Sequence, residues 1–289
     1  MNKGTVNAFR RGIFFLLAAG LTACMPGDTE VVGLPVVPSE AALHGFEAKY
    51  AEAEGVSWEK EQGFYVARFM RGTAPVCAWF REDGEWFLSE EASSFDRLCP
   101  RVVRTFLRSA YAGWKVEEVT LLDRRDMDTV YGISAVDDKR SVHLHYSKFG
   151  DFIKASAGEM ADGHRPVEIP RPISRTLDSL FDSPLILDLW RNDLAINMAV
   201  RDDGVCSFVA FSYAYDWICT FRNIAKAEVK PEVWDAFRAS AYGHFPVEHF
   251  RVSQNGMGLS YLFYFSDGKG KRYILYIKEN GVPDCLVSY

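Results

Sequence analysis

The sequence lacks the features that mark several classes of protein. It has no run of Lys and Arg residues, and its formal net charge is −6 over 289 residues, which argues against a protein that binds nucleic-acid phosphates. The motifs Gly-x-Ser-x-Gly, His-Glu-x-x-His and Cys-x-x-Cys are all absent. Beyond the N-terminal region, no apolar run approaches the roughly 18 residues that a membrane-spanning helix needs. What remains is a globular composition, 48% hydrophobic and 25% charged, with room for one large or two medium domains.

The N-terminal residues have the pattern of a bacterial lipoprotein signal. Three basic residues precede a ten-residue apolar stretch (12–21), which has the length of a signal-peptide core and is too short to cross a bilayer. The stretch ends in Leu-Thr-Ala-Cys, which resembles a lipobox. We therefore interpret residues 1–23 as a lipoprotein signal peptide and Cys24 as the lipid attachment site. The alternatives are a plain secretory signal cut near Ala23 and a buried N-terminal helix.

This signal predicts where the protein is located. A mature bacterial lipoprotein carries enough acyl chains for stable anchoring, so the expected membrane contact is the lipid at Cys24 alone. Met25 follows this cysteine in place of Asp, which by analogy with lipoprotein sorting favours the outer membrane. We expect a cell-envelope protein, lipid-anchored in the outer membrane, and leave open whether it faces the periplasm or the exterior.

Two segments rich in proline and small residues divide the chain. Residues 24–42 are predicted to be a tether and residues 156–173 a linker. The domains lie between and after them, at 43–155 and 174–289, and residues 46–150 of the first align without a gap with the second when Trp86 is placed on Trp217. We call this displacement the repeat shift. Each half divides again into two units of one helix and antiparallel strands. The predicted fold class is therefore α+β, with two copies of a module of about 131 residues that each contain two helix-plus-sheet units.

Each unit carries a recurring pattern. A helix with an aromatic residue near its end precedes a strand beginning with Val, a strand of Tyr-x-Val-x-Phe type, and an apolar strand closing in Phe-x-x-x-Gly. The elements are Tyr50, Val56, Tyr65–Phe69 and Phe80–Gly84 in the first unit, and Tyr111, Val116, Tyr131–Ala135 and Tyr146–Gly150 in the second.

This pattern resembles the PepSY-like domains, which have the beta-lactamase-inhibitor-protein-like (BLIP-like) fold. The third unit departs from it, with Ala195 and Asn197 where the family is more apolar. The resemblance implies a secreted or lipid-anchored protein, related in fold to inhibitors that bind enzymes through a concave sheet surface.

The residues that could carry chemistry do not form a recognisable set. His143 and His145 are two apart on a predicted strand and share a face, as two metal ligands would, but no third ligand has a matching spacing. We predict no metal site, no cofactor and no enzymatic activity. Besides Cys24 there is an odd number of cysteines, which leaves open two disulfides with one free thiol or a fully reduced set: Cys77, Cys99, Cys206, Cys219 and Cys285.

The aromatic residues carry the functional hypothesis. Strand alternation and the repeat predict that one aromatic set points away from the helices: Phe64, Trp79, Tyr261, Phe263, Phe265 and Tyr276. Such residues dominate protein-binding surfaces. We therefore expect a non-catalytic lipoprotein that binds an envelope or extracellular protein or peptide through this face, with inhibition of an extracytoplasmic hydrolase as one specific version. The alternative is that another part of the chain covers this face and the protein is a structural or assembly component of the outer membrane.

Overall fold

The computed structural model describes residues 36–157 and 165–288. These described residues belong to one compact unit. The predicted signal peptide, Cys24 and most of the predicted tether lie outside the described residues, as do residues 158–164 of the predicted linker. Within the described ranges, no helix is both long and apolar enough to cross a membrane.

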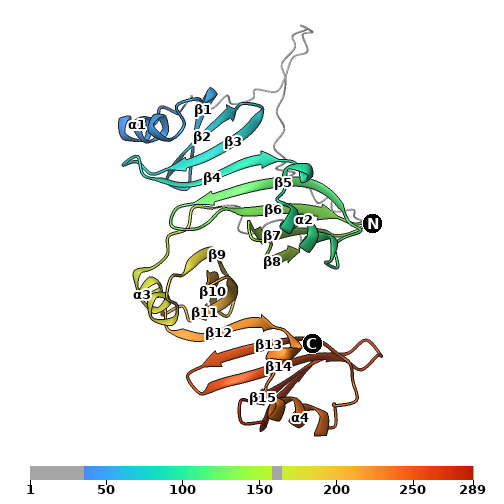
Figure 1. The fold of residues 1–289 in the computed structure, drawn as a ribbon. Helices are drawn as coiled ribbons and strands as arrows, with labels where there is room; N and C mark the ends of the chain where they lie inside the picture. Colours follow the sequence, from blue (N-terminus) through green and yellow to red (C-terminus); the bar gives the residue numbers. More distant parts are fainter. Residues whose placement is uncertain (1–35, 158–164, 289) are drawn as a thin grey trace, which may run out of the picture. The chain divides into compact units, whose positions relative to one another are not determined.

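The described chain repeats one order of elements, a helix followed by four strands (Figure 1). We call the four successive segments quarters one to four. Quarter one contains α1 (Glu40–Lys49), β1 (Glu54–Glu61), β2 (Phe64–Arg71), β3 (Ala74–Phe80) and β4 (Trp86–Ser93). Quarter two contains α2 (Pro100–Leu107), β5 (Lys115–Arg124), β6 (Val130–Val136), β7 (Ser141–Ser147) and β8 (Phe152–Ala157).

Quarter three contains α3 (Arg171–Leu180), β9 (Leu185–Arg191), β10 (Ile196–Asp202), β11 (Val205–Phe211) and β12 (Trp217–Ile224). Quarter four contains α4 (Pro231–Ala239), β13 (Val247–Asn255), β14 (Gly258–Ser266), β15 (Arg272–Lys278) and β16 (Pro283–Ser288). Short 3₁₀ turns, Phe95–Arg97 and Lys226–Glu228, precede α2 and α4.

The strands form two eight-stranded antiparallel sheets, in the orders β1-β2-β3-β4-β5-β6-β7-β8 and β16-β15-β14-β13-β12-β11-β10-β9. Each strand is therefore hydrogen-bonded to its neighbours in the sequence, and each sheet contains the strands of two quarters. The repeat shift places the first residue of α1 on that of α3, and the first residue of α2 on that of α4. The two antiparallel sheets with their few helices agree with the α+β class expected from the sequence.

Local sequence explains where the helices begin and which side they bury. The Ser39 hydroxyl accepts a hydrogen bond from the Ala42 amide at 3.0 Å and so caps α1. Helices α2 and α4 begin at a proline, which has no amide hydrogen, and an amide at that position would have no partner within the helix. Each helix then packs on its sheet through two apolar residues spaced i and i+4, which share one helix face. These buried pairs are Ala42 and Phe46, Val102 and Phe106, Ile173 and Leu177, and Val233 and Phe237.

We call the sheet face that the helices cover the helix face, and the other the opposite face. Phe64 and Trp79 lie on the opposite face, as alternation predicts, where they pack with Val66, Cys77 and Leu88. Trp79 is only 8% exposed, so it offers a partner little surface.

Strand β14 is slipped by one residue relative to the gap-free alignment of the two halves. The loop after β14 has five residues (267–271), whereas the loop after β6 has four (137–140). Leu275 consequently pairs with Phe263, in place of the Tyr264 that the alignment puts opposite it. Because side chains alternate along a strand, a slip of one residue turns every side chain to the other face.

The predicted direction of Tyr261, Phe263 and Phe265 is therefore wrong. All three point to the helix face and are buried under α4, at most 6% exposed. The ring of Phe263 stacks on that of Phe237, with centroids 4.5 Å apart. These aromatic residues form the core of quarter four.

The two sheets contact each other through buried residues. The amide of Asp128, in the loop after β5, donates a hydrogen bond to the carbonyl of Ile186 in β9 at 2.8 Å. Apolar residues of β5, β6, β8, β9 and β10 form one cluster across this contact: Leu122, Val130, Ile153, Leu187 and Ala199.

Candidate functional site

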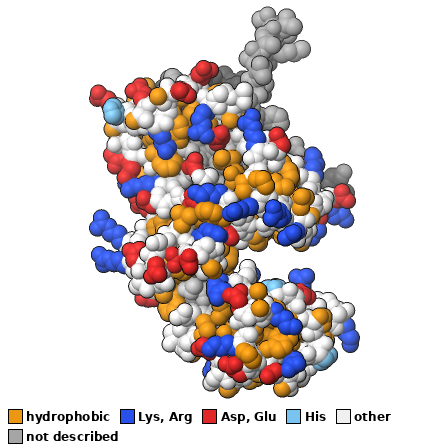
Figure 2. All heavy atoms as spheres, viewed as in Figure 1, with side chains coloured by type: hydrophobic (Ala, Val, Ile, Leu, Met, Phe, Trp, Pro, Cys, Tyr) orange, Lys and Arg blue, Asp and Glu red, His pale blue; other side chains and the backbone are white. Residues whose placement is uncertain are grey.

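A cleft of about 1190 Å³ is lined by residues of both sheets and by the segment that leads into α3. Apart from His145, six of its charged lining residues are basic and two are acidic. The basic residues are Arg124, Arg125, Lys154, Arg165, Arg171 and Arg191, and the acidic ones are Asp126 and Glu168. Both acidic and basic side chains are spread over the face drawn in Figure 2. This cationic cleft therefore stands out from a chain whose net charge is −6.

Strand register brings the charged floor of the cleft together. His145 on β7 pairs directly with Lys154 on β8, so both side chains lie on the same face, and Arg124 ends β5 on that face. Asp188, on β9 of the second sheet, contacts these three side chains and is completely buried. We call these four residues the buried charge cluster.

The contacts of Asp188 account for both of its carboxylate oxygens. Its Oδ1 accepts hydrogen bonds from Arg124 Nη1 at 2.5 Å and from its neighbour's backbone amide at 2.8 Å. Its Oδ2 lies 2.8 Å from His145 Nδ1 and 3.2 Å from Lys154 Nζ. Arg124 also donates from Nη2 to the carbonyl of Leu187 at 3.2 Å, while its buried Nε has no hydrogen-bond partner among the described residues.

Burial and charge act in opposite directions on these groups. Burial alone would raise the pKa of Asp188, but Arg124, His145 and Lys154 hold this pKa well below its usual value. Burial lowers the pKa of His145 more than its hydrogen bond to Asp188 raises it, so the imidazole is neutral near pH 7. Arg124 and Lys154 then oppose a single carboxylate. The floor of the cleft therefore has an excess of one positive charge and an unused N–H donor.

These pKa shifts predict that the protein loses stability in acid. The unfolded chain takes up a proton on His145 below about pH 6.5, and on Asp188 below about pH 4, whereas the folded state resists both. The free energy of unfolding is therefore expected to decrease as the pH falls from about 6.5. Urea unfolding between pH 4 and pH 8 measures this slope, which His145→Gln should flatten between about pH 6.5 and 5.

Two comparisons check the source of that slope. Burial also lowers the pKa of His249, so this residue makes the stability decrease as the pH falls in the same way in the wild type and in the His145→Gln variant. Its contribution therefore cancels when the slopes of the two proteins are subtracted. The exposed His44 on α1 provides the matched control, because His44→Gln should leave the slope as it is. An identical slope in the wild type and the His145→Gln variant would contradict the assignment.

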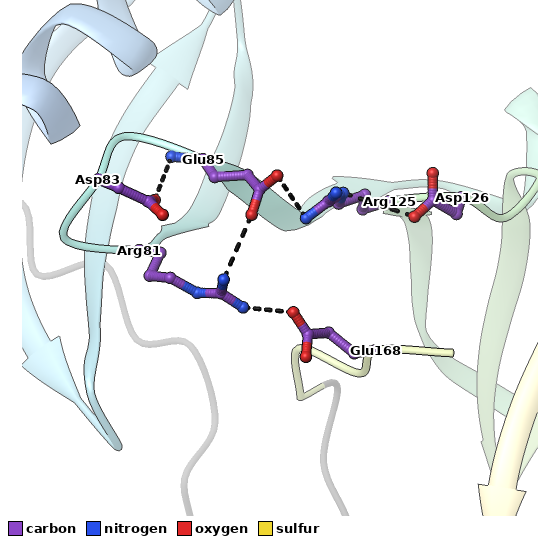
Figure 3. Close-up of polar contacts among 6 residues, drawn as sticks. All are labelled: Arg81, Asp83, Glu85, Arg125, Asp126 and Glu168. Atoms are coloured by element: carbon purple, nitrogen blue, oxygen red, sulfur yellow. Dashed lines mark hydrogen bonds and ion pairs between the residues drawn. The ribbon is translucent and has the colours of Figure 1, made fainter. Parts of the chain in front are cut away.

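One rim of the cleft is held by a chain of ion pairs (Figure 3). Arg81 contacts Glu85 at 3.4 Å and also pairs with Glu168, which lies in the segment before α3. Arg125 contacts Glu85 at 2.6 Å and Asp126 at 3.5 Å. Both acidic residues of the cleft lining are therefore already paired with arginines.

Three other arginines of the cleft lining have no partner of this kind within the described chain. Arg165, Arg171 and Arg191 are exposed, and none of them has an ion pair with another residue in the described ranges. Long side chains of this kind can form bidentate contacts with carboxylates.

Apolar and aromatic residues complete the lining. Lys154 Nζ lies 5.3 Å from the centre of the Trp190 ring, a cation–π distance. Phe87 is packed edge-on against Phe64 and has Arg81 over its ring at 4.4 Å. The principal apolar lining residues are Phe87, Leu122, Val167, Leu189, Trp190 and Tyr215.

The predicted aromatic set is only partly related to this cleft. Phe64 lies next to it through Phe87, whereas Tyr261, Phe263 and Phe265 are in the quarter-four core. Tyr276 is half-buried on the opposite face of the second sheet, where it pairs with Cys285 of β16. A partner-binding role for Phe64 and Tyr276 stays a prediction.

The histidines and cysteines are placed as follows. His145 is bound to Asp188, and His143 Nδ1 lies 2.8 Å from the Ser134 hydroxyl. Over residues 36–157 and 165–288, no group of His, Cys, Asp and Glu could hold a metal ion. The five cysteines in this part of the chain are all free thiols in the structure, including the exposed Cys285.

Sequence reasoning missed most of the cleft. The alternation that put His143 and His145 on one face could also have placed Lys154 there, but no local pattern connects these residues to Asp188 in the other half. Tyr215 could have been noticed, because the repeat shift places it on Gly84.

Solved structures of known proteins resemble parts of this chain. No family model matches the chain, and no curated protein matches it. A DUF2874 family protein from Bacteroides ovatus is 27% identical and covers 44% of this chain and 93% of its own, with a TM-score of 0.42. A BLIP-like protein from Bacteroides fragilis is 25% identical over 50% of this chain and 99% of its own, also with a TM-score of 0.42.

A third similar structure, from Bacteroides eggerthii, is described as a periplasmic protein. It is 18% identical over 44% of this chain and 94% of its own, with a TM-score of 0.42. One of these neighbours is described as BLIP-like, which is the name of the fold that the sequence pattern resembles.

Proposed function

We propose that this chain is a non-catalytic cell-envelope protein whose cationic cleft binds an acidic segment of a partner polypeptide. The observation that carries the proposal is a cleft lining with six basic and two acidic residues, in which Arg165, Arg171 and Arg191 have no ion pair with another described residue. In a chain that is acidic overall, such a cleft attracts negative charge selectively.

The mixed lining favours a polypeptide as the ligand. Trp190, Tyr215 and Val167 provide apolar surface between the charged groups, as the core of a protein interface requires. The volume of about 1190 Å³ exceeds the range typical of small-molecule sites. An extended peptide with carboxylate side chains would satisfy the charges and the apolar surface together.

The proposal includes the membrane anchor and one class of partner. A lipid on Cys24 would hold the protein at the outer membrane, with the cleft available to other envelope proteins. Inhibition of an extracytoplasmic hydrolase is the special case in which the acidic segment belongs to such an enzyme.

Charge reversal in the cleft tests this proposal. The probe is a fluorescein-labelled peptide of alternating Ser and Glu with one central Trp, and its affinity is measured by fluorescence anisotropy. The double variant Arg165→Glu/Arg191→Glu is expected to weaken binding at least about tenfold, because two attractive contacts become repulsive. A Ser-Lys peptide of the same length should not bind the wild type.

Two controls make the result specific. Arg104 is exposed on α2 and does not line the cleft, and Arg104→Glu reverses one charge as each cleft substitution does. This variant should bind the acidic peptide with an affinity within about twofold of the wild type. Phosphatidylglycerol vesicles present negative charge on lipid. Stronger retention by these vesicles than by the acidic peptide would contradict a polypeptide ligand, as would equal binding of the charge-reversed variant.

A further inference from the structure

Quarter three carries large apolar residues at turn positions where quarter one has residues suited to turns. Leu194, in the turn between β9 and β10, corresponds to Gly63 under the repeat shift. Tyr213 and Tyr215, in the turn between β11 and β12, correspond to Glu82 and Gly84. Leu194 is 85% exposed and Tyr213 is 53% exposed, so core packing does not account for these two side chains.

Tyr215 also has a backbone conformation that disfavours a tyrosine. Its φ is +70°, in the left-handed region, where a residue with a Cβ atom is strained. The equivalent turn in the other three quarters has glycine in the same conformation, with φ of +86°, +88° and +83°: Gly84, Gly150 and Gly281. Tyr215 packs in part against the core of quarter three and also lines the cleft, so the strained tyrosine brings an aromatic ring to the cleft where the other quarters have none.

The two turns lie together beside the cationic cleft. The Tyr213 hydroxyl donates a hydrogen bond to the carbonyl of Asn192, which joins the two turns. Tyr215 and Arg191, at the ends of these turns, both line the cleft. We call Leu194, Tyr213 and Tyr215 the apolar rim.

We propose that the apolar rim binds a large apolar side chain that neighbours the acidic residues in the partner segment. This proposal rests on the proposed function, because the acidic residues are those that the cleft binds. Aromatic and aliphatic side chains next to a charged site supply a binding hot spot that charge alone lacks. The preferred ligand is therefore an acidic segment with an embedded aromatic or aliphatic anchor, and not an acidic segment as such.

A double comparison of two peptides with two proteins tests the rim. The probes are the Ser-Glu peptide with a central Trp and the same peptide with Ala in its place. The wild type is expected to bind the Trp peptide at least about tenfold more tightly. The triple variant Leu194→Gly/Tyr213→Ser/Tyr215→Gly is expected to lose that preference and to keep its affinity for the Ala peptide, because the cleft charges are unchanged.

The melting temperature separates this result from loss of the fold. The triple variant is expected to stay folded, because relief of the left-handed backbone strain at position 215 offsets part of the core contact that the Tyr215 ring makes, and the other two changes remove exposed side chains. Leu194→Gly alone removes only an exposed side chain and should reduce the Trp preference about threefold. Met257→Gly, at a 91% exposed residue in the turn between β13 and β14, is the matched control and should keep the preference.

The outcomes distinguish the rim from the cleft. An unchanged Trp preference in the triple variant, with binding still lost on charge reversal, would overturn the rim and leave the proposed function standing. A wild type that binds the two peptides equally would also overturn the rim. Failure of both acidic peptides to bind would instead overturn the proposed function.

Discussion

Replacing Asp188 by alanine is expected to lower the free energy of unfolding by about 3–5 kcal/mol. The carboxylate is completely buried and contacts Arg124, His145 and Lys154 within 3.2 Å. Without it, the cations of Arg124 and Lys154 remain in a site that excludes most of the water, and they repel each other. Urea unfolding at pH 7.5, followed by tryptophan fluorescence, measures the change.

Two further variants identify the buried charge as the cause. Asp188→Asn keeps the shape of the side chain but removes its charge, and we expect it to lose most of the same stability. Asp235 forms an exposed ion pair with Arg238 at a distance of 2.7 Å. Asp235→Ala breaks this pair and should change the free energy of unfolding by no more than about 0.5 kcal/mol. Equal losses for Asp188→Ala and Asp235→Ala would refute a structural role for the buried charge cluster.

The local elements of the fold were readable from the sequence because they depend on neighbouring residues. Helix α2 begins at Pro100, because proline fits the first helical turn. Alternation correctly placed Phe64 and Trp79 on the face opposite α1. A period of two residues requires no knowledge of the rest of the chain.

The direction of the β14 side chains could not be read in that way. It depends on whether a loop has four or five residues before the next strand begins, and an alignment without a gap allows only equal loop lengths. One residue reverses the whole strand, so Tyr261, Phe263 and Phe265 were placed on the wrong face. Repeat alignments locate strands more reliably than they locate faces.

The candidate site was hidden for a different reason. Arg124, His145 and Lys154 share a face by register, but the residue that gathers them is Asp188, which lies in the other half of the chain. Contacts of this kind follow from the packing of two sheets, for which no local period exists. The apolar rim is the exception, because a tyrosine at a repeated glycine position is visible in the sequence.

Replacing Phe263 by alanine is expected to lower the free energy of unfolding by about 3–5 kcal/mol. The ring is completely buried and stacks on Phe237 at an interplanar angle of 4°, with Trp234 at 5.9 Å. Its loss leaves a cavity between α4 and the second sheet that rigid neighbouring rings fill only in part. Urea unfolding measures the loss, and Met257→Ala, at an exposed residue in the turn before the same strand, should change stability by less than about 0.5 kcal/mol.

Binding of the acidic Trp peptide decides between the two roles that Phe263 can have. As a core residue under α4, it should leave the affinity of the folded fraction within about twofold of the wild type, because the cleft is lined by other residues. As a contact residue on an exposed sheet face, it would reduce the affinity while leaving the stability nearly unchanged. A Phe263→Ala protein that is fully stable but no longer binds would therefore contradict the one-residue slip of β14, since only the unslipped register puts this ring on the opposite face.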